Sequence, residues 1–250
     1  MEKFCQPNLP ANNVTTVIMS GEYMYLAEEL NKLNINTITT SPSVNLPFFE
    51  RYHTDMQCSY YAQGKIVIDE EAQHLVKKIT KHGVSVELSS SIIKPEYPLN
   101  IALNHLIVND TFIGKVNNTD KYILKFCEKN NYKIINVNQG YTKCSTAIVN
   151  QNALITADQS IYKACLKHHI DVLKIDAGDI CLYRYNYGFI GGCCCKLSKD
   201  IMAFTGKVSK HKNYNEIKSF LLNYGVNLLE LSNKPLIDIG GIIPIQEKCC

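Results

Sequence analysis

The sequence predicts an α/β fold in which five similar units surround a common axis, as a five-bladed pseudo-fivefold α/β propeller. Three observations favour it: five amphipathic helical stretches recur, each is followed by a β-type run and a hairpin, and the incomplete last unit lacks a strand that the N-terminus can supply. We expect a single domain over 1–250, with units at approximately 21–68, 69–115, 116–157, 158–207 and 208–245 plus strand 14–20.

The five helical stretches are recognised by apolar residues that recur every three to four positions. They cover residues 22–33, 71–82, 120–131, 159–169 and 214–225. Their starts lie 49, 49, 39 and 55 residues apart, which favours one domain of irregular units over two domains. A β-type run follows each helix, at 36–40, 84–90, 133–137, 171–175 and 227–231.

Hairpins are expected after an irregular loop in each of the first four units, because a turn signal divides two β-type runs. They span 58–68, 103–115, 144–157 and 193–204. The fifth unit has only the run 240–245, and strand 14–20 has no partner in its own unit. We therefore predict that the two chain ends pair and close the ring, which removes an exposed sheet edge. An open doubly wound sheet fits less well, since hairpins imply antiparallel pairing and no glycine-rich phosphate loop follows a first strand.

Composition limits the cellular locations and the kinds of binding partner that fit the chain. The 250 residues are 46% hydrophobic and carry a net charge of +3, too small to indicate nucleic acid or an anionic membrane as partner. No run reaches the roughly 18 apolar residues that a membrane span requires, and the N-terminus lacks a secretory apolar stretch. We expect a cytoplasmic protein that acts on a small molecule, with the oligomeric state left open.

The cysteines do not suggest a metal centre. All 11 are expected to be reduced thiols in a cytoplasmic protein, and no repeated C-x2-C spacing indicates zinc. Neither metal nor cofactor is expected. Redox or metal handling by Cys193–Cys195 and by the terminal pair Cys249 and Cys250 remains an alternative.

Five irregular loops precede the hairpin positions and should meet near the axis on one face of the ring. They cover 51–59, 97–105, 138–146, 187–195 and 235–243. Rigid scaffolds commonly present functional side chains on such loops. Their polar residues and glycines include His53, Asp55, Asn100, Asn104, Lys143, Cys144, Asp238, Gly191, Gly192 and Gly240. A structural explanation is also open, because a crowded axis needs small residues and side chains that bond backbone groups.

The strings "HTDMQ" (53–57), "QGYTKCS" (139–145), "GFIGG" (188–192) and "DIGG" (238–241) give a resemblance that covers nearly the whole chain. The chain resembles the pentein, or guanidino-group-modifying, superfamily, and an uncharacterised bacterial family assigned to that fold. The superfamily contains deiminases, dimethylarginine hydrolases and amidinotransferases, together with non-catalytic ribosome anti-association factors. The resemblance implies the five-unit fold.

Residue by residue, the resemblance implies a nucleophile at Cys144 and an acid–base histidine at His53, two units apart as in the superfamily enzymes. Asp55 completes the His-x-Asp motif. Asp238 lies close to the position of the glutamate in the family's Glu-Gly-Gly string, although the Gly-Gly pair that follows it here is offset by one residue. Glycine replaces the aspartate of the family's Phe-Thr-Arg-Asp string, which counts against arginine-like substrates. The expected substrate-binding residues are Asp55, Asp238, Asn100, Lys143, Gly191, Gly192 and Gly240.

The predicted function is cysteine-dependent hydrolysis or transfer on a small guanidine, amidine or related C–N substrate, through a thiouronium-type intermediate. A guanidinium carbon is a poor electrophile, so attack requires a thiolate. Lys143, a protonated His53 and the substrate cation are expected to lower the pKa of Cys144. The alternative is a non-catalytic pentein that binds a protein, a ribosome or a small ligand.

Overall fold

Five sheets of the computed structural model, which describes residues 1–249, share one strand pattern. In each, an antiparallel pair is extended by a parallel strand that follows the next helix. Four sheets are continuous in sequence: β4–β6 (Cys58–Ala62, Lys65–Ile68, Ser85–Leu88), β7–β9 (Leu106–Val108, Thr111–Gly114, Lys133–Asn136), β10–β12 (Thr146–Asn150, Ala153–Thr156, Asp171–Lys174) and β14–β16 (Cys194–Ser198, Ile201–Phe204, Asn227–Glu230). The predicted hairpins are confirmed.

The fifth sheet joins the two ends of the chain. It contains β2 (Val14–Met19), β3 (Asn36–Thr39) and β18 (Ile242–Lys248), and β18 pairs antiparallel with β2 as predicted. A strand that the sequence did not predict, β1 (Glu2–Phe4), pairs with the other edge of β18. Within residues 1–249 no strand pairing links one of these five sheets to the next, so they do not form a closed sheet.

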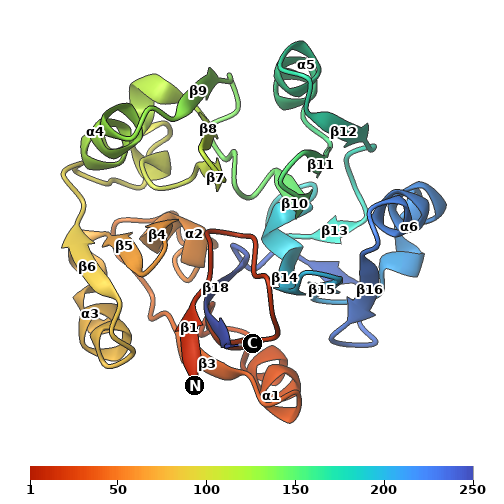
Figure 1. The fold of residues 1–250 in the computed structure, drawn as a ribbon, viewed down its shortest axis with the longest axis horizontal. Coiled ribbons are helices and arrows are strands. Elements are labelled where there is room, and N and C mark those ends of the chain that lie inside the picture. Colours follow the sequence, from red (N-terminus) through yellow and green to blue (C-terminus); the bar gives the residue numbers. More distant parts are fainter. Residues whose placement is uncertain (250) are drawn as a thin grey trace.

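The predicted helices form the periphery of the molecule, and β4, β7, β10, β14 and β18 lie nearer its centre (Figure 1). They are α1 (Met24–Lys32), α3 (Gln73–Thr80), α4 (Lys121–Lys129), α5 (Gln159–Lys167) and α6 (Tyr214–Asn223). Each buries one face, as Ile161 and Cys165 do on α5, four positions apart. None of the helices in residues 1–249 has the length and hydrophobicity to span a membrane.

Shorter elements complete the loops. A four-residue helix, α2 (Thr54–Gln57), precedes β4, and a two-stranded parallel sheet joins β13 (Ile180–Cys181) to β17 (Leu236–Ile237). Single 3-10 turns lie at η1 (Glu70–Ala72), η2 (Leu99–Ile101), η3 (Val116–Asn118), η4 (Gly191–Cys193) and η5 (Val208–Lys210).

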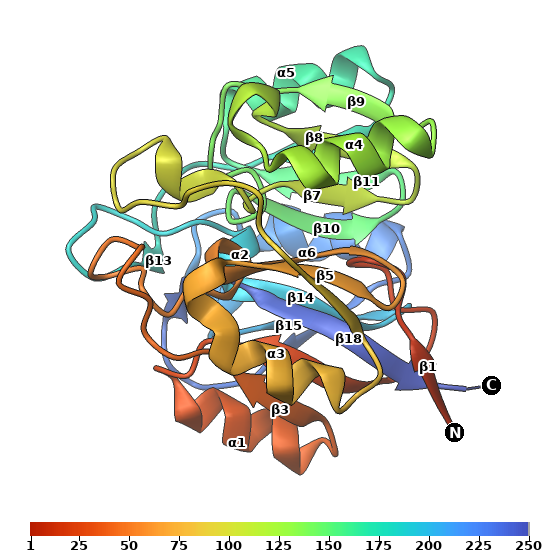
Figure 2. The ribbon, with the colours of Figure 1, turned by 90° about the vertical axis from the view of Figure 1, so that its left-hand side faces the viewer.

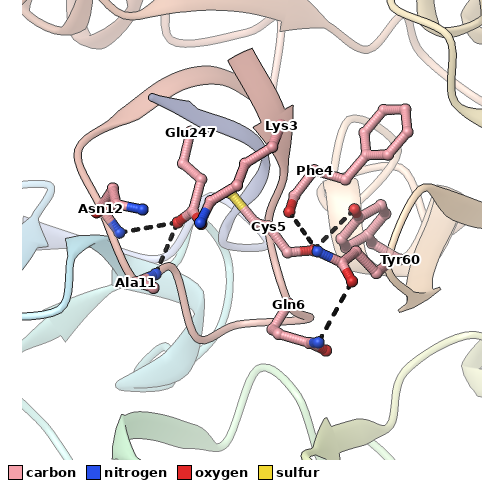
Figure 3. A network of polar contacts seen from close by, with 9 residues as sticks. Lys3, Phe4, Cys5, Gln6, Ala11, Asn12, Tyr60 and Glu247 are labelled. Atoms are coloured by element: carbon pink, nitrogen blue, oxygen red, sulfur yellow. Dashed lines mark hydrogen bonds and ion pairs between the residues drawn. The ribbon is translucent and has the colours of Figure 1, made fainter. Parts of the chain in front are cut away.

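The two ends of the molecule differ. In Figure 2 the long loops that contain residues 41–53, 89–104 and 181–190 extend from one end, and both termini lie at the opposite end. At the terminal end the Oε2 atom of Glu247 accepts hydrogen bonds from the backbone N–H groups of Ala11 (2.6 Å) and Asn12 (2.9 Å) (Figure 3). The hydroxyl of Tyr60 donates to the carbonyl of Cys5 at 3.0 Å. These contacts fix residues 1–13, the N-terminal strap, against the sheets.

Candidate active site

Cys144 lies two residues before β10 and is only 2% exposed. Its thiol donates a hydrogen bond to Oδ2 of Asp55 at 2.9 Å, and its sulfur accepts one from Nδ2 of Asn104 at 3.2 Å. The Oδ1 atom of Asn104 in turn accepts the backbone N–H groups of Lys143 (2.8 Å) and Cys144 (3.3 Å). Asn104 therefore fixes both the loop and the sulfur.

His53 and Asp55 are placed by α2, where the sequence suggested only an irregular loop. His53 is the N-cap residue, with an extended backbone (φ −60°, ψ 121°), and its carbonyl accepts the N–H of Gln57 at 3.2 Å. The N–H of Asp55 donates to the carbonyl of Gly240 at 3.1 Å, which ties α2 to the loop before β18. This turn brings the histidine to the cysteine: the ligating atoms of His53, Cys144 and Asp238 all lie within 4.8 Å of one another.

Asp238 is completely buried and held by the backbone. Its Oδ2 atom accepts the N–H of Phe189 at 2.9 Å, and its Oδ1 atom accepts the N–H of Gly240 at 3.0 Å. These bonds come from two different loops, so the carboxylate has a fixed orientation before any ligand binds.

The three glycines expected to bind substrate instead lie where the loops press against each other. A Cβ on Gly192 would come 1.8 Å from Oδ1 of Asp238, and one on Gly240 (φ +73°) would come 2.4 Å from Cβ of His53. A Cβ on Gly191 would meet the carbonyl oxygen of Lys143 at 2.2 Å. None of the three lines the cavity beside Cys144. Their positions favour the structural explanation, close packing at the axis.

Lys143, Asn100 and Asp55 also lie outside the cavity lining. The Lys143 side chain is buried, and its Nζ atom lies beside Gly241, as does Oδ2 of Asp55. Its positive charge offsets part of the rise that burial causes in the pKa of Asp55 and of Asp238. The side-chain amide of Asn100 donates to the hydroxyl of Tyr141 at 2.8 Å and thus supports a residue of the cavity wall.

A cavity of about 270 Å³ opens beside the thiol, lined in part by the loops that contain residues 41–53 and 181–190. Most of its wall is aromatic or apolar, and much of it comes from the loop 181–190. Sequence reasoning did not single out Glu50 or this wall, although the tyrosine-rich string "YRYNYGF" (183–189) was a signal. The lining residues are Glu50, His53, Tyr141, Cys144, Leu182, Tyr185, Asn186, Tyr187, Phe189 and Asp238.

Burial dominates the electrostatics of this site. It lowers the pKa of His53 to about 4, with the negative charge of Glu50 offsetting part of the effect, so the imidazole is neutral at pH 7. Burial raises the pKa of Asp55 to about 7 and that of Asp238 to about 6. Burial, reinforced by Asp55 and Asp238, raises the pKa of the Cys144 thiol well above its ordinary value. The expectation that a protonated His53 lowers the thiol pKa is therefore wrong for the unliganded site.

Two kinds of ligand match these groups. A planar cation could be held by the carboxylates beside the thiol. The nitrogen, sulfur and oxygen donors of His53, Cys144 and Asp238 could also hold one divalent ion, since they are the ligand types that zinc takes. The other candidate cluster is not of this kind: Cys193, Cys194 and Cys195 are buried and join no such donor group within residues 1–249. Cys249 is exposed, and Cys250 lies outside the described residues.

Comparison with solved structures identifies the fold. The inosamine-phosphate amidinotransferase of Streptomyces griseus aligns with a TM-score of 0.62 and 10% identity, over 99% of this chain and 98% of that one. The agmatine deiminase of C. jejuni gives 0.55 and 10%, over 92% and 91% of the two chains. DDAH from Pseudomonas aeruginosa gives 0.54 and 12%, over 95% and 100%. The chain thus has the mixed α/β fold of the guanidino-group-modifying, or pentein, superfamily.

Within that fold the chain belongs to the family described as "Family of unknown function (DUF6873)", whose pattern it matches over residues 18–243. No curated protein is significantly similar to it in sequence.

Proposed function

We propose that this protein is a cysteine-dependent hydrolase or transferase that acts on a small amidine or guanidine cation through a covalent adduct of Cys144. The observation that carries the proposal is the meeting of His53, Cys144 and Asp238 within 4.8 Å beside a cavity. The amidinotransferase and deiminase folds to which the chain is similar support it.

Binding of the cation is the first step. Asp238, which lines the cavity, accepts N–H groups of the planar substrate and holds its central carbon over the sulfur of Cys144. Asp55 contacts the thiol from outside the lining and adds a negative charge close to the bound cation. The positive charge of the substrate stabilises the thiolate and the two carboxylates, all of which burial disfavours in the empty site. The nucleophile is thus activated only when the substrate is present.

Proton transfer falls to His53, whose imidazole is neutral before the reaction. It takes the thiol proton as the sulfur–carbon bond forms, and gives that proton to the amine that departs as the carbon–nitrogen bond breaks. The thiouronium-type adduct is then attacked by water. One proton of that water passes through His53 to the sulfur as the carbon–sulfur bond breaks, and the other is lost from the protonated product to solvent. In a transferase an acceptor amine replaces the water.

The remaining site residues act indirectly. Asn104 fixes the sulfur, and Lys143 favours the ionised forms of the two aspartates. The repeated strand pattern supports our further proposal that the five units, with the boundaries expected from the sequence, form one pseudo-fivefold propeller domain whose paired chain ends close the ring.

The direct test is release of amine or ammonia from a panel of amidines and guanidines, followed by substitution of the nucleophile. We expect Cys144→Ala to reduce turnover by at least about a thousandfold, because no other group would form the adduct. Cys165→Ala removes an equally buried thiol from α5 and should leave turnover unchanged. Full turnover by the Cys144→Ala protein would overturn the proposal, and loss of turnover on treatment with a chelator would favour a metal at the same donors.

A further inference from the structure

Glu50 is an acid of the cavity wall that the proposed mechanism does not use. It is 5% exposed, and its Oε2 atom has no hydrogen-bond partner within residues 1–249. Its backbone carbonyl accepts the N–H of His53 at 2.8 Å, which places it one turn from the proposed catalytic histidine. The hydroxyl of Tyr185, a residue that is 47% exposed, is in hydrogen-bonding contact with this carboxylate and offsets part of the rise that burial causes in the pKa of Glu50, so one partner is present. A buried carboxylate is costly unless a cation or several hydrogen bonds compensate it.

The cavity offers Glu50 no such cation from the protein. No lysine or arginine is among the lining residues. The arginines of the neighbouring loops are engaged with aromatic rings: the guanidinium carbon of Arg51 lies 4.3 Å from the ring centre of Phe48, and that of Arg184 lies 5.5 Å from that of Tyr183. A substrate carboxylate would therefore face two acids, Glu50 and Asp238, without a positive partner in the lining.

The rest of the wall suits an uncharged spacer. Tyr141 and Phe189 lie nearly parallel, with ring centres 6.1 Å apart, and Tyr187 meets Phe189 edge to face at 6.3 Å. Aromatic faces pack against alkyl chains and attract cations. The wall therefore offers apolar contact to a spacer, and its donors, the tyrosine hydroxyls and the side-chain amide of Asn186, carry no positive charge for an anion.

We propose that Glu50 is a specificity-determining residue, and that the substrate carries a second positive charge joined to its amidine or guanidine by an uncharged spacer. The amidine end lies at Cys144 and Asp238, the spacer lies against the aromatic wall, and the second cation pairs with Glu50. This inference rests on the proposed function of the Cys144 site, and it predicts discrimination against amino-acid-like substrates that end in a carboxylate.

The test separates binding from turnover by using titration calorimetry on the Cys144→Ala protein. Three probes of equal spacer length are compared: an ω-aminoalkylguanidine, the simple alkylguanidine and the ω-guanidino acid. We expect the aminoalkylguanidine to bind about tenfold more tightly than the alkylguanidine, and the acid to bind most weakly. Adding Glu50→Gln should abolish the tenfold preference. The control Glu96→Gln, which removes an exposed acid from another loop of the same end, should retain it.

The outcomes distinguish the two proposals. Equal binding of the aminoalkylguanidine and the alkylguanidine, or an unchanged preference in Glu50→Gln, would overturn the role of Glu50 and leave the proposed function standing. Failure of all three probes to bind would overturn both. The ranking of the probes on the Glu50-containing protein decides the substrate class even if Glu50→Gln does not fold.

Discussion

At the scale of single residues, Asp55 is a buried carboxylate whose ionised form is only partly compensated by hydrogen bonds. It accepts the thiol of Cys144 through Oδ2, but its Oδ1 atom is buried and has no hydrogen-bond partner within residues 1–249. Burial raises its pKa to about 7, so its ionised form is destabilising in the empty protein. A bound cation removes that cost. The buried carboxylate is therefore poorly suited to stabilising the fold of the empty protein.

Asp55→Asn should consequently stabilise the protein in a pH-dependent way. The folded pKa of Asp55 lies above its ordinary 3.8, so the folded state holds a proton that the unfolded state has lost, and stability falls as pH rises from about 4 to about 7. The substitution should raise the free energy of unfolding at about pH 8 by up to roughly 4 kcal/mol, and change it little at about pH 3.5.

Urea unfolding at the two pH values measures this effect. Asp110→Asn, at an exposed position, is the matched control and should change stability equally little at both. Destabilisation by Asp55→Asn at the higher pH would contradict the assigned cost of the buried carboxylate.

The sequence indicated the four central side chains of the site but not its wall. Cys144, His53, Asp55 and Asp238 lie in short strings with recognisable residue types, and the structure brings them together. Glu50 lies in no such string, and its position in the cavity depends on the conformation of the loop 41–53. Local sequence patterns contain no information on such a tertiary arrangement.

At the scale of elements, the site depends on close contact between short loops. Gly192 lies in η4, where its carbonyl accepts the N–H groups of Ile239 (3.0 Å) and Gly241 (2.9 Å), and its own N–H donates to the carbonyl of Cys144 at 2.9 Å. One glycine thus connects the loops that carry the cysteine and the aspartate.

Gly192→Ala should therefore remove the site without abolishing the fold. The added methyl group would lie 1.8 Å from Oδ1 of Asp238 and must displace that carboxylate. We expect at least about a tenfold loss of guanidine affinity and a stability loss of about 1 to 3 kcal/mol, measured by calorimetry and urea unfolding. Gly178→Ala, where no atom lies within 4 Å of the added Cβ but φ is +121°, should lose stability through backbone strain and still retain the affinity. Unchanged affinity in Gly192→Ala would contradict the role of Asp238.

Long periodic elements were predictable, and short ones were not. The helices and hairpins contain enough residues for apolar spacing to show their type. In contrast, α2 has four residues, β1 has three, and β13 and β17 have two each. Their conformations are set by contacts from distant parts of the chain, such as the bond from Asp55 to the carbonyl of Gly240. This is why His53 was assigned to a loop and not to a helix N-cap.

At the scale of the whole molecule, the two chain ends are joined through β18, which pairs with both β1 and β2. Glu247 on β18 is 2% exposed, binds the N-terminal strap through two backbone N–H groups, and lies 3.5 Å from Nζ of Lys3. Among residues 1–249, β1 of the strap is the only strand that pairs with the edge of β18 opposite β2. The buried carboxylate of Glu247 helps to hold the strap in this position.

Glu247→Ala should destabilise the protein by about 2 kcal/mol, because two backbone N–H groups of the strap lose a charged acceptor. Urea unfolding measures the loss, and hydrogen exchange should show faster exchange of β1 and β18 amides. Glu28→Ala, at an exposed position of α1, should have little effect. Equal stability of the two variants would contradict the importance of the strap.

The central claim, that Cys144 is a nucleophile directed at amidine cations, is tested most directly by peptide mass spectrometry after alkylation. Chloroacetamidine carries the cation that the site should bind, and chloroacetamide is its neutral counterpart. The account predicts that the cationic reagent modifies Cys144 at least about a hundredfold faster than any other cysteine, and that guanidine ligands protect it. The neutral reagent should show no such preference. Modification spread over several cysteines, or equal rates for the two reagents at Cys144, would contradict the account.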